Sequence, residues 1–367
     1  YLDQYSPSPV QAKVAHNIMN CKTGAYGANV CVCEDCGFVQ IHYNSCRNRC
    51  CPMCQAVPKE MWMDARREDV LDAPYFHLVF TVPDILNPVI YSNQRLLYDA
   101  LYHAASSTIS ELTADPKHLG AKVGYICILH TWGSEMNFHP HIHTILLGGG
   151  LASNNQWKDN GENFFLPIRV ISKMFRGKYL EELKRLWEED KLVFHGTAEK
   201  FRNHYTFKEL LDSCYGMDWI PHCKKTFNGA QTVIKYLGKY THRIAVSNHR
   251  IVRMDDDTVT FLVKDYRNEG QWKELTISGV EFVRRFLMHV PPRRFVRIRH
   301  YGLLCSRTKS QKLTLCRNLL GCKKYLSKLR DMEMPEILEH LYGIKVCVCK
   351  ACGGHLGKPQ MRMPLRC

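Results

Sequence analysis

The sequence FHPHIHTILLGGG, residues 138–150, places two histidines on either side of one large apolar residue. Successive side chains of a β-strand point to opposite faces, so His141 and His143 project to the same side while Ile142 enters the core. Two imidazoles held by a rigid strand form half of a binding site for a divalent metal ion. We therefore expect a strand here, with a candidate metal site on one of its faces.

A second strand is expected immediately before it. Residues 124–132, GYICILHTW, are rich in apolar and β-favouring side chains, and residues 133–137 have the composition of a turn. The two strands then form a hairpin, and antiparallel pairing can bring His130 beside His141 and His143. Three imidazoles on one hairpin predict an open metal site.

An isolated pair of histidines two residues apart is more often structural than metal-binding. Here His130 and His139 add further imidazoles, a glycine-rich turn is expected at residues 148–150, and the chain is basic. These features favour the metal site. Its ion would bind the non-bridging oxygens of a scissile phosphate and polarise the phosphorus for in-line attack. Neutral histidine suits Mn²⁺, Co²⁺ or Zn²⁺, and a site that keeps water positions open can use Mg²⁺.

A second motif is IKYLGKYTHR, residues 234–243, in which Tyr236 and Tyr240 lie four apart and share one face of an expected helix. Aromatic residues at this spacing are also common as one core and one surface side chain. Neighbouring cations would favour a phenolate and hold a phosphate, and these are the candidate DNA-binding residues Lys235, Lys239 and Arg243.

Attack by a tyrosine on DNA would conserve the phosphodiester energy in a protein–DNA bond. Strand joining would then need no ATP, and the chain contains no GxxxxGK[ST] motif. Two tyrosines would allow two such bonds in succession. Gly238 between them costs about 1 kcal/mol in a helix interior, and we interpret it as a place where DNA comes close.

The composition favours a multidomain protein with a polyanionic partner. The chain has 367 residues and 50 Lys plus Arg against 35 Asp plus Glu, a formal net charge of +15. This excess favours nucleic acid over a membrane surface. The sequence has neither an apolar run long enough for a transmembrane helix nor the pattern of a signal peptide at its beginning. We expect a soluble, cytosolic protein without membrane contact.

The 18 cysteines are clustered, with eight between Cys21 and Cys54 and four between Cys347 and Cys367. In a long cytosolic chain such clusters favour zinc over disulfides. Two CxxC pairs flank residues 37–50 and predict one site of four thiolates. These ligands are Cys33, Cys36, Cys51 and Cys54.

Other cysteines leave further zinc sites open. Cys21, Cys31, Cys46 and Cys50 could complete a second site, or Cys46 could replace one of the four ligands. The pair Cys349 and Cys352 could bind zinc with Cys347, His355 or Cys367. Between the first pairs, Arg47 and Arg49 could contact phosphates or belong to a solvated basic loop.

The remaining periodicity predicts alternating helices and strands. Helices are expected over 7–20, 57–72, 92–113, 280–290 and in the tail up to residue 342. A strand is expected over 75–83, a strand followed by a long helix over 165–189, and a β-meander from 243 to about 278. Residues 195–231 interleave aromatic and basic residues, which suits a surface for stacked bases or an aromatic core.

These motifs together resemble the HUH transposases of the insertion sequence 91 family, a rolling-circle group with an N-terminal zinc-binding domain. Residues 45–55, SCRNRCCPMCQ, are similar to its zinc signature, with Cys50 where histidine is more usual. The other similar blocks are YFHLVFTVP (75–83), LHTWG (129–133), FHPHIHTILLGGGL (138–151), FRGKYL (175–180), YLGKYTHRIAVSNHRI (236–251), EFVRRFLMHV (281–290) and FVRIRHYGLL (295–304).

The resemblance implies an α+β fold, with a central antiparallel sheet flanked by helices. It implies a zinc-binding DNA-recognition domain at 1–58, an HUH nuclease domain at 59–290 and a mostly helical basic region at 291–367. His141 and His143 would be metal ligands, with His130 as the third ligand and His139 as the alternative. Tyr236 and Tyr240 would be the nucleophiles.

The expected function is a DNA transposase that nicks one strand through a 5′-phosphotyrosine intermediate and transfers it. It would use Mg²⁺ or Mn²⁺ at the histidines and Zn²⁺ in the N-terminal domain. Its partners would be single-stranded DNA, the element ends and target DNA, in the nucleoid of a bacterial cytoplasm. The alternatives are a plasmid-type rolling-circle replication initiator and a zinc-ribbon DNA-binding regulator without catalysis.

Overall fold

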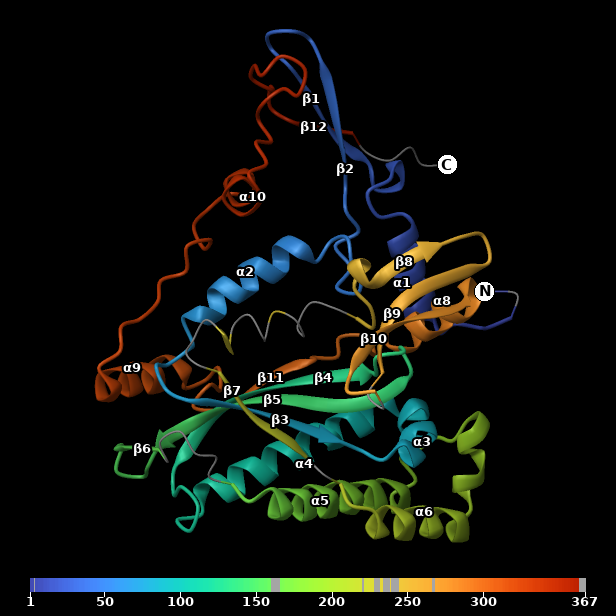
Figure 1. Ribbon diagram of the computed structural model, residues 1–367, viewed down its shortest axis with the longest axis vertical. Coiled ribbons are helices and arrows are strands. Elements are labelled where there is room, and N and C mark those ends of the chain that lie inside the picture. Colours follow the sequence, from blue (N-terminus) through green and yellow to red (C-terminus); the bar gives the residue numbers. More distant parts are fainter. Residues whose placement is uncertain are drawn as a thin grey trace.

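The computed structural model of the protein describes residues 1–2, 4–159, 166–219, 221–227, 232–233, 238, 244–265 and 268–362. At its centre lies an antiparallel sheet with the strand order β11, β4, β5, β3, β7, and β6 pairs with β5 (Figure 1). These strands are β3 (Tyr75–Thr81), β4 (Lys122–Trp132), β5 (Phe138–Leu151), β6 (Trp157–Asp159), β7 (His222–Phe227) and β11 (Ile298–Gly302).

The predicted hairpin of two strands is confirmed. Strands β4 and β5 are antiparallel neighbours, and His130 is paired with His141 while Ile128 is paired with His143. Ile142 is fully buried in the core on the opposite face of β5, as the alternation of side chains requires.

The expected turn at residues 148–150 is wrong, because these glycines continue strand β5. Gly150 is paired with Val123 of β4 and with Lys158 of β6. A Cβ atom on Gly149 would collide with the Trp157 ring, and one on Gly150 would collide with the backbone of Lys122. Glycine is therefore needed here for close approach of neighbouring chain segments rather than for a turn.

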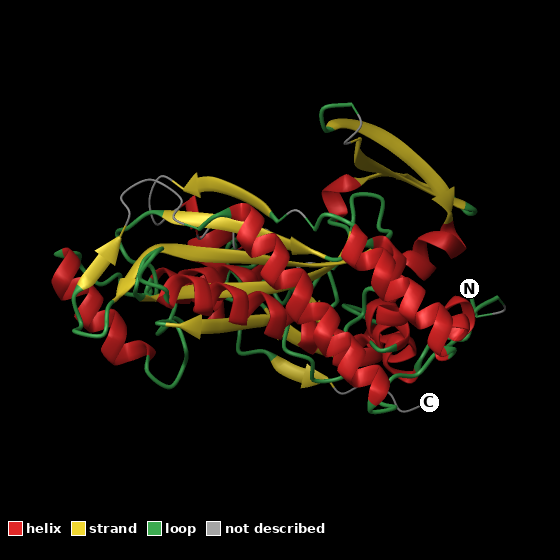
Figure 2. Cartoon of the chain, turned by 90° about the horizontal axis from the view of Figure 1, so that it is seen from below, coloured by secondary structure: helices red, strands yellow, loops and turns green. Residues whose placement is uncertain are grey.

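Helices cover one face of the sheet. They are α3 (Asn87–Ser92), α4 (Gln94–Ala114), α5 (Ile168–Glu188) and α6 (His204–Gly216). Seen from below, they lie in front of the strands (Figure 2). Buried aromatic side chains of α4 and α5, such as Tyr102 and Phe175, join Phe80 and Ile142 of the sheet in one core. The strand expected at the start of 165–189 is wrong, because α5 begins directly after Pro167, which suits a helix start.

Helices α2 (Ala56–Arg67) and α9 (Lys309–Leu320) lie on the other side of the sheet. Leu313 and Cys316 of α9 share a smaller core with Leu147 and Ile128 of the sheet. Strand β11, within the predicted C-terminal region, is hydrogen-bonded to β4. The central sheet therefore extends past the predicted domain boundary at residue 290.

A separate three-stranded sheet is formed by β8 (Ile251–Met254), β9 (Thr258–Asp265) and β10 (Gln271–Ser278). It corresponds to the predicted meander, except that residues 244–248 form no strand. Helices α1 (Pro9–Met19) and α8 (Gly279–Met288) contribute to its core, which includes Val14, Phe261 and Leu287.

The predicted zinc-binding region contains a hairpin of β1 (Ala28–Val32) and β2 (Val39–Tyr43) that projects from the body (Figure 1). After α9 the chain continues through α10 (Met334–Tyr342) to β12 (Gln360–Arg362), which pairs with β1. Within residues 291–362, strand β11 thus joins the central sheet and strand β12 joins the sheet of the hairpin. Among the described helices, none has both the length and the apolar character that crossing a bilayer requires.

Candidate metal centre and nucleic-acid cleft

Three histidines of the β4–β5 hairpin converge on one point. The ligand nitrogens of His130, His141 and His143 lie within 4.8 Å of one another, and all three side chains are buried. The two Nε2 atoms of His141 and His143 are 3.1 Å apart. The His130 ring stacks on Trp132 with a centroid distance of 4.4 Å, which holds it at the edge of the group.

Hydrogen bonds orient these rings. The Nδ1 atom of His141 is 2.7 Å from the carbonyl oxygen of His139, so it is the protonated nitrogen and its Nε2 carries a lone pair. Burial lowers the pKa of His141 to about 4, although the bond to the His139 carbonyl opposes this. Burial, assisted by the neighbouring imidazoles, also lowers the pKa of His143 well below its usual value. Both rings are therefore neutral at pH 7, as metal ligands must be.

A fourth histidine, which the sequence analysis missed, supports the group. His77 of β3 is buried, and its Nε2 lies 2.9 Å from Nδ1 of His143 with the two rings stacked. The period-two pattern of β3 could have revealed it, because Phe76, Leu78 and Phe80 face the helical core and His77 must then face the other side.

His139, the alternative third ligand, is not part of this group. Its Nδ1 atom lies 3.1 Å from the Asp84 carboxylate at the surface, and its side chain is about one-third exposed. His130 is thus the residue that the structure brings to the pair, as its register opposite His141 requires.

The histidines line a large cleft of about 1120 Å³ between the central sheet and the β8–β10 sheet. Its other walls come from the start of α2 and from the segment 244–250. Lys264 and Trp272 lie on the side of the β8–β10 sheet, with the Lys264 ammonium 5.3 Å from the Trp272 ring. Arg250 also lines the cleft, but its guanidinium binds the carbonyl oxygens of Leu262 and Ser134.

The predicted nucleophiles Tyr236 and Tyr240 lie outside the described residues, as do Lys235, Lys239 and Arg243. Gly238, at the centre of the tyrosine motif, is described and lines the cleft. A Cβ atom there would collide with the Met63 sulfur of α2. Met63 thus packs against this glycine, and the close approach of DNA to the same position stays a prediction.

Two clusters of four cysteines are present among the described residues, and neither is the four-cysteine set that we predicted. Cys51 and Cys54 are grouped with Cys21 and Cys46, whereas Cys33 and Cys36 are grouped with two cysteines of the distant segment after α10, Cys349 and Cys352. The predicted set of Cys33, Cys36, Cys51 and Cys54 is therefore divided. The physical reason is that Cys33 and Cys36 lie at the tip of the projecting β1–β2 hairpin, whereas Cys51 and Cys54 come just before α2 (Figure 1).

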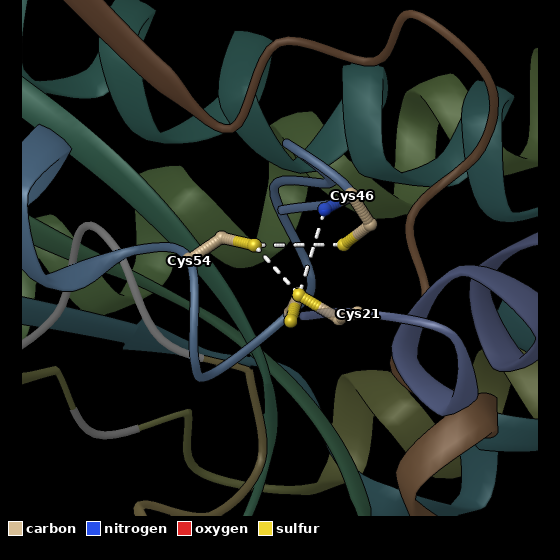
Figure 3. A group of neighbouring side chains, drawn as sticks. Cys21, Cys46 and Cys54 are labelled. Carbon is tan, nitrogen blue, oxygen red and sulfur yellow. Dashed lines mark hydrogen bonds between the residues drawn. The ribbon is translucent and has the colours of Figure 1, made fainter. Parts of the chain in front are cut away.

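The first cluster, part of which is drawn in Figure 3, lies at the open end of the hairpin, because Cys21 comes shortly before β1 and Cys46 shortly after β2. The sulfur of Cys54 is 3.2 Å from that of Cys21 and 3.5 Å from that of Cys46. Burial opposes ionisation of Cys54, but hydrogen bonds from its three cysteine neighbours lower its pKa to about 7. Cys50 is buried on the cleft wall and lies outside both clusters.

Two protein-family models match the chain. Residues 124–312 match the family model described as "Putative transposase". Residues 1–82 match the "Transposase zinc-binding domain" of insertion sequence 91 elements. The chain is 39% identical over 350 residues to "Putative transposase y4qJ" of Sinorhizobium fredii, covering 95% of this chain and 88% of that protein. The chain belongs to the insertion sequence 91 family of rolling-circle transposases.

A further member is the transposase for insertion sequence element IS801 of Pseudomonas savastanoi pv. phaseolicola, with 30% identity over 309 residues, 83% of this chain and 72% of that protein. Among solved structures, the conjugative relaxase TrwC in complex with oriT DNA in its metal-bound form has 16% identity and a TM-score of 0.25. That match covers 30% of this chain and 43% of the relaxase chain. A similarity this low carries no argument about fold or chemistry.

For this transposase the zinc-binding domain contains all ligands of the first cluster, since Cys21 to Cys54 lie within residues 1–82. Zinc binding at this end of the chain is thus supported by the family and by the clustered thiols.

Arg47 and Arg49, the two arginines predicted to contact DNA in the zinc-binding domain, have different partners. Arg49 donates to the carbonyl oxygens of Phe295 and Pro292, at 2.6 and 3.2 Å, and so ties the zinc-binding region to the rest of the protein. Arg47 is exposed, and its contact with phosphate stays a prediction.

Proposed function

We propose that the transposase cuts and joins single-stranded DNA by the HUH mechanism, through a 5′-phosphotyrosine intermediate. In the first step the phenolate oxygen of Tyr236 or Tyr240 attacks the scissile phosphorus. The bond from phosphorus to the 3′ oxygen breaks, and that oxygen takes up a proton and leaves as a free 3′-OH. In the reverse direction a 3′-OH attacks the phosphotyrosine, which rejoins DNA and restores the tyrosine.

The observation that carries this proposal is the position of the three imidazoles. His130, His141 and His143 converge on the wall of a cleft that Gly238, the centre of the tyrosine motif, also lines. The three candidate metal ligands and the glycine of the tyrosine motif, which lie far apart in the sequence, thus line one cavity. A zinc-ribbon regulator without catalysis needs neither feature.

The residues present fit a divalent ion. Two buried neutral imidazoles direct Nε2 atoms that are 3.1 Å apart to the same point, a separation that two bonds of about 2.1 Å to one ion can span. We propose Mg²⁺ or Mn²⁺ as the physiological ion. Such an ion, when bound, would neutralise the charge on the non-bridging phosphate oxygens and polarise the phosphorus.

The remaining cleft residues suit a single strand of DNA. Lys264 is exposed and can pair with a phosphate, and the half-exposed Trp272 ring beside it offers a stacking surface for a base. We propose that the element ends and then the target DNA occupy this cleft, with the protein acting at the bacterial nucleoid. Zinc at the first cysteine cluster would support the region that recognises the ends.

The test is a covalent adduct assay. The protein is incubated with Mn²⁺ or Mg²⁺ and labelled oligonucleotides that carry the element ends, and the products are separated on a denaturing gel. A labelled protein band that requires metal is expected for the wild type, and it should be lost in His141→Ala and in the double variant Tyr236→Phe, Tyr240→Phe. His103→Ala, an exposed histidine on the far helical face, is the matched control and should retain the adduct.

An adduct that persists without both tyrosines would refute the nucleophile assignment. Tight, metal-independent DNA binding without any adduct would favour the zinc-ribbon regulator instead.

A further inference from the structure

The second cysteine cluster is built from two copies of one short motif. Residues 30–37, VCVCEDCG, and residues 346–353, VCVCKACG, are identical at six of eight positions. The C-x-x-C-G part of each copy forms the same turn. The N–H of Gly37 donates to the carbonyl oxygen of Cys33, and the N–H of Gly353 donates to that of Cys349, both at 3.0 Å. Gly37 and Gly353 have positive φ angles of 72° and 77°, which suit glycine. Paired turns of this C-x-x-C-G type are how zinc ribbons present thiolates.

The two turns face each other with their sulfur atoms directed to a common centre. The sulfur of Cys33 is 3.6 Å from that of Cys352, and the sulfur of Cys36 is 3.8 Å from that of Cys349. All four sulfurs lie within 4.8 Å of one another. Four thiolates at the Zn–S distance of about 2.3 Å in a tetrahedron are separated by about 3.8 Å. A disulfide would need about 2.05 Å, so the spacing is that of a zinc tetrathiolate.

Backbone contacts align the two turns independently of the sulfurs. Strand β12 pairs with β1, and Cys33 forms a β-bridge with Leu356. The N–H of Glu34 donates to the carbonyl of His355 at 3.0 Å, and the N–H of His355 donates to the Asp35 carboxylate at 3.1 Å. Leu356 is buried with Cys31, Cys33 and Cys349 in a small apolar cluster of its own. The site is therefore built into both segments.

We propose that Cys33, Cys36, Cys349 and Cys352 bind a second structural zinc ion, shared between the β1–β2 hairpin and the segment that follows α10. The family's zinc-binding domain spans residues 1–82 of this chain, so half of this ligand set lies outside it. The ion completes a zinc ribbon whose two halves are separated by more than three hundred residues. This proposal is independent of the nuclease chemistry.

The ion would also fasten the long arm between α9 and β12. At its other end the arm is held on α2, where the buried Asp64 carboxylate accepts hydrogen bonds from Tyr325, Ser327 and the Leu329 backbone at 2.7, 2.6 and 3.0 Å. The projecting hairpin and the arm thereby support each other (Figure 1). Binding of zinc at the hairpin should therefore depend on Cys349 and Cys352, which lie outside the zinc-binding domain at residues 1–82.

The experiment counts zinc in the full chain by native mass spectrometry. The wild type, loaded with zinc and freed of weakly held ions, should carry two zinc ions in thiolate sites. Cys36→Ser and Cys349→Ser should each carry one fewer, and the double variant should also carry only one fewer, since both residues serve the same ion. Cys347→Ser, an exposed cysteine two residues from Cys349 and outside the cluster, is the matched control and should keep both ions.

Two outcomes would overturn the proposal. In one, Cys349→Ser keeps two zinc ions. In the other, Cys36→Ser and Cys349→Ser each lose one ion but the double variant loses two, which would mean separate sites.

A Cys352→His variant reconstituted with Co²⁺ resolves the case in which serine variants fail to fold. Direct ligation predicts that the protein still binds the metal but that the visible d–d bands move to shorter wavelength, because an imidazole replaces a thiolate. A spectrum identical to that of the wild type would refute ligation by Cys352.

Discussion

The hydrogen bond between His77 and His143 leads to a quantitative prediction about metal affinity. For Nε2 of His143 to bind an ion, the proton of this neutral ring must sit on Nδ1, and the Nδ1–H then donates to Nε2 of His77 at 2.9 Å. In His77→Phe the ring shape is kept but the acceptor is lost. The metal-loaded form would then contain a buried N–H without an acceptor.

The cost of that N–H sets the size of the effect. An unsatisfied buried donor costs about 1–3 kcal/mol. The metal-free form avoids this cost, because His143 can keep its proton on Nε2 and donate it to Nε2 of His141 at 3.1 Å. We therefore expect His77→Phe to weaken metal binding by roughly 10- to 100-fold, which is the usual effect of removing such a supporting group.

The assay is a titration of the full chain with Mn²⁺, followed by electron paramagnetic resonance of the free ion. His300→Phe is the matched control, because His300 is a partly buried histidine of the neighbouring strand β11 and is not among the three clustered histidines. His77→Gln, whose amide oxygen can accept the same N–H, should retain most of the affinity. An unchanged affinity in His77→Phe, or an equal loss in His300→Phe, would refute the reasoning.

Three further predictions concern pH, the arm and the cleft. Burial lowers the pKa of His289 to about 4. The unfolded chain then binds this proton at higher pH than the folded one, so His289 alone should lower the unfolding free energy by about 3 kcal/mol between pH 6.5 and 4. Urea titrations should show a loss that is smaller by this amount in His289→Leu than in the wild type. Asp64→Ala leaves three arm donors without their acceptor and should destabilise the arm by roughly 1–3 kcal/mol for each donor that stays buried, seen as faster proteolysis within residues 321–333, whereas Glu60→Ala on the same helix should not. Trp272→Ala should weaken single-strand binding in fluorescence anisotropy by about 1–3 kcal/mol, while the exposed Met254→Ala on the same sheet leaves it unchanged.

The hairpin that carries the three histidines could largely be predicted from the order of apolar and polar residues in the sequence. The alternation of FHPHIHT places His141 and His143 on one face, and the short turn after LHTW brings His130 opposite them; the structure agrees in both respects. Such predictions succeed because strand geometry and hairpin register depend on residues close together in the sequence. The expected turn at residues 148–150 failed because the same glycines can serve a turn or a close strand contact, and only the position of Trp157 and Lys122 distinguishes the two.

The cysteines show what local pattern cannot decide. Spacing alone identified the CxxC pairs, but it could not say which pair shares an ion with which. The pairing depends on the length of the β1–β2 hairpin and on the return of the chain from α10 to β1, which brings Cys349 and Cys352 to Cys33 and Cys36.

The sequence by itself therefore supplied the family and the candidate groups: two histidines on one strand face, a paired-tyrosine motif and pairs of cysteines. The tertiary structure decided which groups act together, namely His77 with His143, Gly238 with the cleft, and the two distant cysteine turns with each other. The physical reason is that side-chain direction follows from a few neighbouring dihedral angles, whereas contacts between distant segments depend on how whole sheets and helices pack.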